Sequence, residues 1–218
     1  MKKVINIAHR GYTRVHLENT LEAFQAALEL GADGVEFDVQ ETADGEFVIH
    51  HNDDIDGKPL LEQTLSQLRD LRLKGKYSIP TLEGTLLLLG DKVILMIELK
   101  QVRSVEKLTG IVQEKCDMSK TVIVSFSRQL IDRVGKLAPD TMRAVIGGQS
   151  DAQGNTPGRF KGLSCADVTE EAVSKAHKAG SLVFVWDCPD EAGVRRALRF
   201  DIDGIISDYP DVVKELAH

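Results

Sequence analysis

The chain has 218 residues, 42% hydrophobic and 28% charged, which fits one globular domain with a substantial core. Its formal net charge is −7 and no Lys or Arg run forms a basic stripe, which argues against a nucleic-acid partner. Its three cysteines lack CxxC spacing, which argues against a zinc site or a disulfide framework. No apolar run is long enough for a signal peptide or a membrane span, so we expect a cytoplasmic protein without stable membrane association.

Short apolar runs typical of buried strands alternate with helical patterns along most of the chain. The runs that predict strands are residues 4–8, 34–39, 46–51, 93–99, 121–126, 142–147, 163–168, 182–187 and 204–207. The periodicities that predict helices are residues 18–32, 105–116, 128–138, 169–180, 190–200 and 211–217. The repeated order of strand then helix indicates a parallel sheet.

One strand candidate does not belong to this repeat. Only "QETADG" separates residues 34–39 from residues 46–51, which allows an antiparallel return but not a parallel crossover. Residues 46–51 therefore form a hairpin arm at the start of a small insertion, roughly 41–80. The insertion contains the amphipathic stretch 61–73 and ends before a new helix that is predicted to begin near "PTLEG". The remaining eight β/α units predict a single TIM (β/α)₈ barrel over residues 1–218. An open doubly wound sheet is the alternative, although no phosphate loop of the GxGxxG or GxxxxGK[ST] type favours it.

The stretch "GVEFDVQ" places two acids on one face of a buried strand, because side chains alternate faces along a strand. These acids are Glu36 and Asp38, and Glu98 on the next barrel strand adds a third. Arg10 and Lys100 are the main cations nearby, and simple ion pairs with them are one explanation. A carboxylate cluster also suits a hard divalent cation, Mg²⁺ or Ca²⁺ with Mn²⁺ possible, better than zinc.

Two histidines are predicted to flank these acids. His9 ends the first strand, and His51 ends the hairpin arm, where strand parity groups it with the arm's apolar residues and turns His50 to the opposite face. Such a pair can take a proton from a nucleophile and give one to a leaving oxygen in a displacement at phosphorus. Arg10 and Lys100 would add positive charge to that site. The non-functional alternatives are that His9 is a structural residue, hydrogen-bonded at the end of its strand, and that Lys100 only forms an ion pair with an acid.

Other polar or aromatic residues also follow strands or precede helices. Trp186 and Asp187 end the strand 182–187, and Asp208 follows the last strand. Trp186 is either a core residue or a substrate contact. Residues 18–20 can be no more than the start of the first helix, with Asn19 as its N-cap.

In order along the chain, several blocks resemble the glycerophosphodiester phosphodiesterase family. "AHRGYTRVHLENTLEAFQAALELGAD" resembles its His-Arg-Gly opening followed by Glu-Asn-Thr, and "GVEFDVQETADGEFVIHHND" resembles its Glu-x-Asp strand, Asp-Gly turn and catalytic histidine. "IPTLEG", "MIELK", "FVWD" and "DGIISDYP" are similar to its later blocks. The resemblance implies a barrel with a small insertion. It also implies these site residues: metal on Glu36, Asp38 and Glu98, His9 and His51 as general acid and base, and Arg10 and Lys100 on the phosphate. We also predict that Trp186 binds the substrate.

The resemblance implies hydrolysis of a small-molecule glycerophosphodiester to sn-glycerol 3-phosphate and an alcohol. Asn52 stands where the family usually has Asp, the common Arg-Thr-Thr is absent, and Gly84 replaces a common acid. A lipid-directed, lysophospholipase D-like phosphodiesterase and a non-catalytic phosphate-binding module are the rival interpretations. The head group, the metal, the order of the histidines, a cyclic phosphate intermediate and the oligomeric state are left open.

Overall fold

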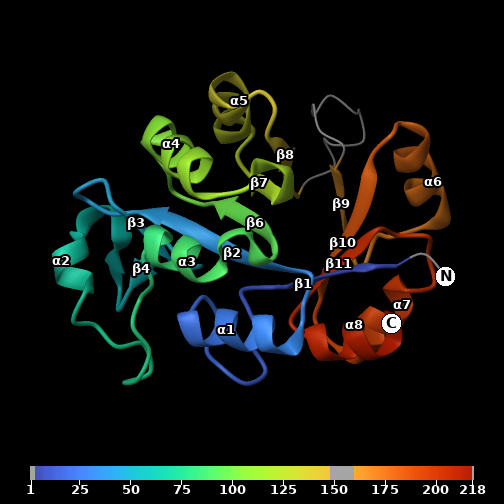
Figure 1. Cartoon of the computed structure of the whole chain (residues 1–218), viewed down its shortest axis with the longest axis horizontal. Coiled ribbons are helices and arrows are strands. Elements are labelled where there is room, and N and C mark those ends of the chain that lie inside the picture. The colour runs from blue at the N-terminus through green and yellow to red at the C-terminus, as the bar shows by residue number, and fades with distance from the viewer. Residues whose placement is uncertain (1–2, 148–159, 218) are drawn as a thin grey trace.

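The computed structural model describes residues 3–147 and 160–217, and its centre is a nearly closed parallel barrel (Figure 1). Its eight strands are hydrogen-bonded in the order β8-β7-β6-β2-β1-β11-β10-β9. Neighbours in this order are consecutive barrel strands in sequence, except that the first strand, β1, pairs with the last, β11. The order therefore never reverses as it does in a doubly wound sheet. The predicted (β/α)₈ barrel is confirmed. The strands are β1 (Ile5–Ala8), β2 (Gly34–Glu41), β6 (Ile94–Leu99), β7 (Thr121–Ser125), β8 (Met142–Val145), β9 (Phe160–Ser164), β10 (Leu182–Cys188) and β11 (Gly204–Ser207).

Helices surround the barrel and follow the strands in the predicted alternation (Figure 1). Five of them begin after a Thr, Ser or Asp whose side chain accepts the backbone N–H three residues further on. Such caps satisfy a donor that has no partner inside the helix. Within the described ranges, no helix is long and apolar enough to cross a membrane. The helices are α1 (Leu21–Leu30), α3 (Leu82–Leu89), α4 (Val105–Lys115), α5 (Arg128–Leu137), α6 (Glu170–Lys178), α7 (Glu191–Ala197) and α8 (Pro210–Ala217).

Strand alternation separates two apolar regions and decides where the acids point. On β2, Val35, Phe37 and Val39 belong to the core that packs against the helices. A second cluster fills the barrel interior with residues such as Ile7, Met96, Val124 and Phe184. Because alternate residues face opposite sides of a strand, Glu36 and Asp38 point into the interior, above this apolar cluster.

The segment predicted as an insertion lies beside β2 and α3 (Figure 1). Its first strand, β3 (Phe47–Ile49), pairs antiparallel with β2, as the short Asp-Gly connection predicts. The rest contains β4 (Asp54–Ile55), β5 (Lys58–Pro59), a 3₁₀ turn (Leu60–Glu62) and the short helix α2 (Leu65–Leu68), so only part of the amphipathic stretch is helical. The segment has a small apolar cluster of its own. That cluster is built on Val48, Ile55, Leu60 and Leu68. The division of the chain at residues 41–80 stays a prediction.

One predicted strand is misplaced. The apolar run 163–168 predicts a strand, but β9 covers Phe160–Ser164 and pairs with β10 there. The chain turns at once after Ser164, whose side-chain oxygen accepts the N–H of Ala166 and whose carbonyl accepts the N–H groups of Asp167 and Val168. A serine that satisfies the following backbone in this way favours a turn over a continued ladder.

Candidate active site

A cavity of about 150 Å³ opens at the carboxyl ends of the barrel strands. This is the end of a TIM barrel at which loops from several strands can converge on one ligand. Half of the residues that line it are polar and the other half are apolar. The polar half comprises His9, Arg10, Glu36, His51, Glu98, Lys100 and Asp187, and the apolar half comprises Met96, Val124, Phe126, Ile146, Phe160, Trp186 and Ile206.

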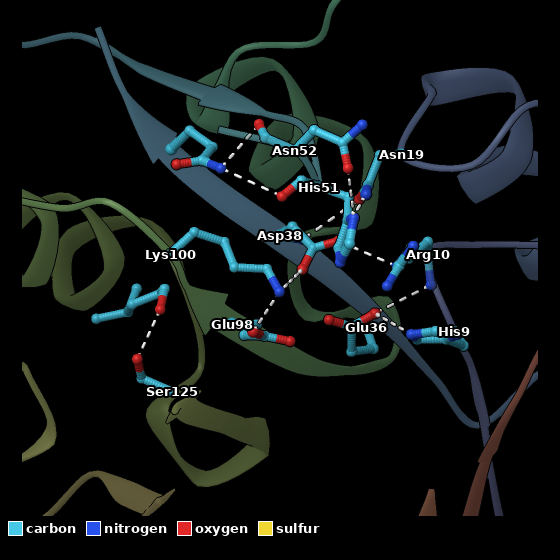
Figure 2. A network of polar contacts seen from close by, with 12 residues as sticks. His9, Arg10, Asn19, Glu36, Asp38, His51, Asn52, Glu98, Lys100 and Ser125 are labelled. Carbon is cyan, nitrogen blue, oxygen red and sulfur yellow. Dashed lines mark hydrogen bonds and ion pairs between the residues drawn. The ribbon is translucent and has the colours of Figure 1, made fainter. Parts of the chain in front are cut away.

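Three buried carboxylates, Glu36, Asp38 and Glu98, form an acid cluster, and two of them, Glu36 and Glu98, line the cavity. The register of β2 and β6 places Asp38 directly beside Glu98, and Glu36 lies two residues earlier on the same face. One oxygen from each residue lies within 4.8 Å of the others, and all three side chains are buried. Figure 2 shows the three acids turned toward one another on the two neighbouring strands. The predicted acid cluster therefore exists in the folded chain.

Two cations reach the acid cluster from opposite sides (Figure 2). Lys100 Nζ lies 2.6 Å from Glu98 Oε1 and 3.2 Å from Asp38 Oδ1. Arg10 Nε lies 3.2 Å from Asp38 Oδ2, and the backbone N–H of Arg10 donates to Glu36 Oε2 at 3.1 Å. The ion pairs that the sequence left as an alternative are thus present. These ion pairs involve Asp38 and Glu98, whereas Glu36 is contacted by the Arg10 backbone N–H and, at 3.9 Å, by His9 Nε2.

The acid cluster retains the features expected of a site for a hard cation. Glu36 Oε1 is buried without a hydrogen-bond partner among the described residues, whereas Lys100 reaches Asp38 Oδ1 and Glu98 Oε1. Burial raises the pKa of Glu36 well above its usual value, and the neighbouring charges of Asp38 and Glu98 add to this effect. Buried carboxylate oxygens without donors are costly unless a cation compensates them. The residues present fit a divalent ion such as Mg²⁺ or Ca²⁺.

His9 is held by acids on two sides. Its Nδ1 lies 2.9 Å from Asp208 Oδ1, and its Nε2 lies 3.6 Å from Asp187 Oδ1 and 3.9 Å from Glu36 Oε2. Burial lowers the pKa of His9, but the hydrogen bond with Asp208 and the charges of Glu36 and Asp187 outweigh burial and raise it to about 9. The Asp208 contact fixes the ring so that Nε2 faces the cavity between Glu36 and Asp187.

His51 reaches the cavity by a route that the parity argument misses. β3 pairs Ile49 with Val39, and both belong to the helix-facing core, so a continued strand would turn His51 toward the helices. Instead β3 ends at Ile49, and the bend that follows brings His51 into the cavity wall. The ring is oriented by Asn52, whose Oδ1 lies 2.9 Å from His51 Nδ1. The two predicted histidines therefore line one cavity, although the reason given for His51 was wrong.

His50 does not turn away from the acids, contrary to the expectation. Its backbone N–H donates to the carbonyl of Asp38 at 3.0 Å, at the point where the hairpin arm leaves β2. Burial lowers the pKa of His50, against the opposing effect of a hydrogen bond with the Asp54 backbone and the charges of Glu18 and Asp38. The register that pairs Ile49 with Val39 sets His50 opposite Asp38, on the face of β2 that carries the acids, although His50 does not line the cavity wall.

A family model for the glycerophosphoryl diester phosphodiesterase family matches residues 9–212. The chain belongs to this family. A glycerophosphodiester phosphodiesterase from Caldanaerobacter subterraneus is 30% identical, with 98% of each chain covered. A glycerophosphodiester phosphodiesterase structure from Agrobacterium tumefaciens is 26% identical with a TM-score of 0.85, over 98% of this chain and 99% of that one. The corresponding Thermotoga maritima structure is 28% identical with a TM-score of 0.84, over 99% of each chain. The family resemblance inferred from sequence is confirmed.

Asn19, from the Glu-Asn-Thr block that the family shares, is a site residue that the helix-cap interpretation missed. The N-cap of α1 is Thr20, and Asn19 instead donates through Nδ2 to Asp38 Oδ2 at 2.7 Å and accepts the Asp38 backbone N–H at 3.2 Å. It does so with a positive φ of 56°, a conformation that Asn tolerates better than most residues. Glu18 contributes as well, because it accepts from Arg10 Nη1 at 3.0 Å. Only the resemblance carried a signal for these contacts.

Trp186 lies in the apolar half of the cavity. Its ring meets Phe126 edge to face, with the ring centroids 6.1 Å apart and the planes at 89°. Phe126 is more than half exposed and also lies under Lys100, whose Nζ is 5.5 Å from the ring centroid. The indole N–H of Trp186 is buried without a partner among the residues that the structure describes. Trp186 therefore lies at the cavity wall, where its side chain can contact a bound substrate.

Proposed function

We propose that the protein hydrolyses glycerophosphodiesters to sn-glycerol 3-phosphate and an alcohol, with a divalent metal ion and two histidines. The observation that carries the proposal is the convergence of His9 and His51 on one cavity with the buried acid cluster. Membership of the family and the names of full-length relatives support the reaction class. The substrate is thus a small phosphodiester rather than a nucleic acid, in keeping with the net charge of −7.

Glu36, Asp38 and Glu98 would hold the metal ion, which is Mg²⁺ or Ca²⁺ by their oxygen chemistry, with Mn²⁺ also compatible. When bound, the ion supplies positive charge that polarises a phosphoryl oxygen. Asn19 keeps Asp38 in place by bonding both its carboxylate and its backbone N–H. The unpartnered oxygen of Glu36 supports this assignment, because it is buried in the cluster and no described donor satisfies it.

Arg10 and Lys100 bind the phosphate of the substrate. Both line the cavity, and both already lie against acids of the cluster, so they can contact an anion bound beside the metal. Their positive charge stabilises the transition state most strongly, because negative charge accumulates on the phosphoryl oxygens there. Arg10 is held for this task by Glu18, and Lys100 by Glu98 and Asp38.

His9 and His51 move the protons. One of them takes a proton from the nucleophile, and the other gives a proton to the leaving alcohol oxygen. Each ring has its Nδ1 bound to a side-chain oxygen, Asp208 for His9 and Asn52 for His51, which directs Nε2 to the cavity. The same pair serves whether water or the substrate's own 2-hydroxyl attacks phosphorus first.

The test is a substrate panel with matched metal conditions. Purified protein is incubated with glycerophosphocholine, glycerophosphoethanolamine, glycerophosphoglycerol or lysophosphatidylcholine, each with Mg²⁺, Ca²⁺, Mn²⁺ or excess EDTA. We expect release of sn-glycerol 3-phosphate from at least one glycerophosphodiester with metal and none with EDTA. Faster turnover of lysophosphatidylcholine would favour the lipid-directed rival. Binding of phosphate without turnover of any substrate would favour the non-catalytic module and overturn the proposal.

A further inference from the structure

Gln40 is a fully buried side chain that joins the two loops on either side of the acid cluster. It lies on the face of β2 that carries Glu36 and Asp38. Its Nε2 is 3.2 Å from the carbonyl oxygen of His51, 3.0 Å from that of Asn52 and 3.2 Å from Asp53 Oδ1. Its Oε1 accepts the backbone N–H of Gln101 at 3.0 Å. The side chain is therefore hydrogen-bonded at both ends.

The hydrogen-bond partners of Gln40 indicate more than the pairing of a buried amide with nearby backbone groups. Two N–H groups share three acceptors, and all three belong to the bend after β3 that brings His51 into the cavity. The bend has no strand partner of its own, because the ladder between β2 and β3 ends at Ile49. The carboxamide supplies the donors that a continued strand would otherwise have supplied.

We propose that Gln40 is a positioning residue for His51, an inference that rests on the proposed function of the cavity. Gln40 does not line the cavity and so acts only through the backbone that it holds. His51 and Asn52 are both fixed through their carbonyl groups, so the ring that Asn52 orients and the chain that carries it are held as one unit. Loss of the carboxamide leaves His51 present but misplaced.

The size of the effect follows from the geometry that proton transfer demands. A misplacement of about 1 Å can cost about 10²-fold in rate, so we expect Gln40→Met to lower kcat by roughly 10- to 100-fold. KM should change by less than about threefold, because Arg10, Lys100 and the acid cluster keep their own contacts. The thermal shift caused by saturating Mg²⁺ should remain, since no metal ligand is altered.

The matched control is Gln63→Met. Gln63 is also a buried glutamine, and its Nε2 donates to the carbonyls of Lys58 at 2.8 Å and Pro59 at 3.5 Å, within the insertion and away from the cavity. It should lower the melting temperature by an amount similar to Gln40→Met while leaving kcat unchanged. A general loss of stability would instead lower kcat in both variants.

A double-mutant cycle provides the decisive measurement, made on the fastest glycerophosphodiester of the panel with saturating Mg²⁺. If Gln40 acts through His51, then Gln40→Met should lower the residual kcat of His51→Ala by less than about threefold. Gln40→Glu keeps the acceptor for Gln101 but loses the donors to the bend, so it should lose kcat as well. Gln40→Asn repeats the test if Gln40→Met does not fold.

The inference would be overturned by a kcat of Gln40→Met within twofold of the parent, or by an undiminished effect in the His51→Ala background. Full activity of Gln40→Glu would also overturn it, because the link to Gln101 would then be the one that matters. Failure of the proposed function looks different. In that case either the parent protein turns over no glycerophosphodiester, or His51→Ala itself keeps its activity, whatever Gln40→Met does.

Discussion

Binding of a divalent ion to the acid cluster of Glu36, Asp38 and Glu98 should stabilise the fold, and one substitution should abolish this effect. The perturbation is Glu36→Gln, which removes a buried carboxylate whose Oε1 has no described donor. Because burial and the nearby charge of Asp38 disfavour the ionised form of Glu36, the metal-free variant should be at least as stable as the parent. With the metal bound, the parent should instead be more stable than Glu36→Gln.

The magnitude follows from mass action. An ion that binds only the native state at 100 times its Kd adds about 2.7 kcal/mol to the free energy of unfolding. For a chain of 218 residues, each kcal/mol corresponds to a shift in Tm of about 2–4 °C. The parent protein should therefore gain about 5–11 °C in Mg²⁺ or Ca²⁺ relative to EDTA. Differential scanning fluorimetry or calorimetry across a metal titration measures this shift directly.

Glu41→Gln is the matched control for this experiment. Glu41 is a buried carboxylate on the same strand, but its oxygens accept from the backbone N–H groups of Arg103 and Ser104 and from Ser104 Oγ. Its substitution should cost about 1–3 kcal/mol through unsatisfied donors, and it should leave the metal-induced shift intact. The reasoning is refuted if Glu36→Gln keeps the full shift or if Glu41→Gln loses it.

The remaining predictions concern the histidines, the insertion and a thiol. His9→Ala and His51→Ala should each lower kcat by roughly 10²–10⁴, and a nitrophenyl phosphodiester should rescue only the variant that lacks the general acid; rescue of both or of neither would contradict the division of roles. Replacement of residues 41–80 by a short linker should leave an α/β fold by circular dichroism without activity, and complete unfolding would count against the proposed division. Burial raises the pKa of Cys116 to about 11, so its alkylation in the native state should accelerate with pH up to that value. Because the folded pKa exceeds the unfolded one, stability from this thiol should be complete below pH of about 8.5 and should fall as pH rises through the folded pKa. A native alkylation rate that levels off near pH 9 would refute the assignment.

The parts of the fold that sequence predicts are those governed by local pattern. Alternation along β2 correctly places Glu36 and Asp38 on the interior face, and the Asp-Gly connection correctly predicts the antiparallel arm. The repeated order of strands and helices favours a barrel, because consecutive units usually pack beside one another. The two β2 features depend on neighbours within a few residues.

The errors arise where a contact distant in sequence decides the outcome. Asn19 looks like a helix cap in its own segment, yet its hydrogen bonds go to Asp38, nineteen residues away. The position of His51 depends on where β3 stops, and periodicity cannot locate that point because an alternating pattern does not show its own end. The strand ending at Ser164 was misplaced for a different, local reason, since its hydroxyl group accepts the backbone N–H of Ala166 and satisfies the turn instead of the ladder.

The small apolar cluster of Val48, Ile55, Leu60 and Leu68 affects the order in which parts of the protein unfold. His9 stands on the barrel, whereas His51 stands beside this separate and much smaller cluster. Segments with few buried contacts open at lower free energy than the rest of a domain. In mild denaturant the segment that carries His51 should therefore open and separate His51 from His9 while the barrel is still folded. Catalytic activity should then be lost at a lower denaturant concentration than the circular dichroism signal of the barrel. Turnover would then be the most sensitive gauge of this protein's integrity.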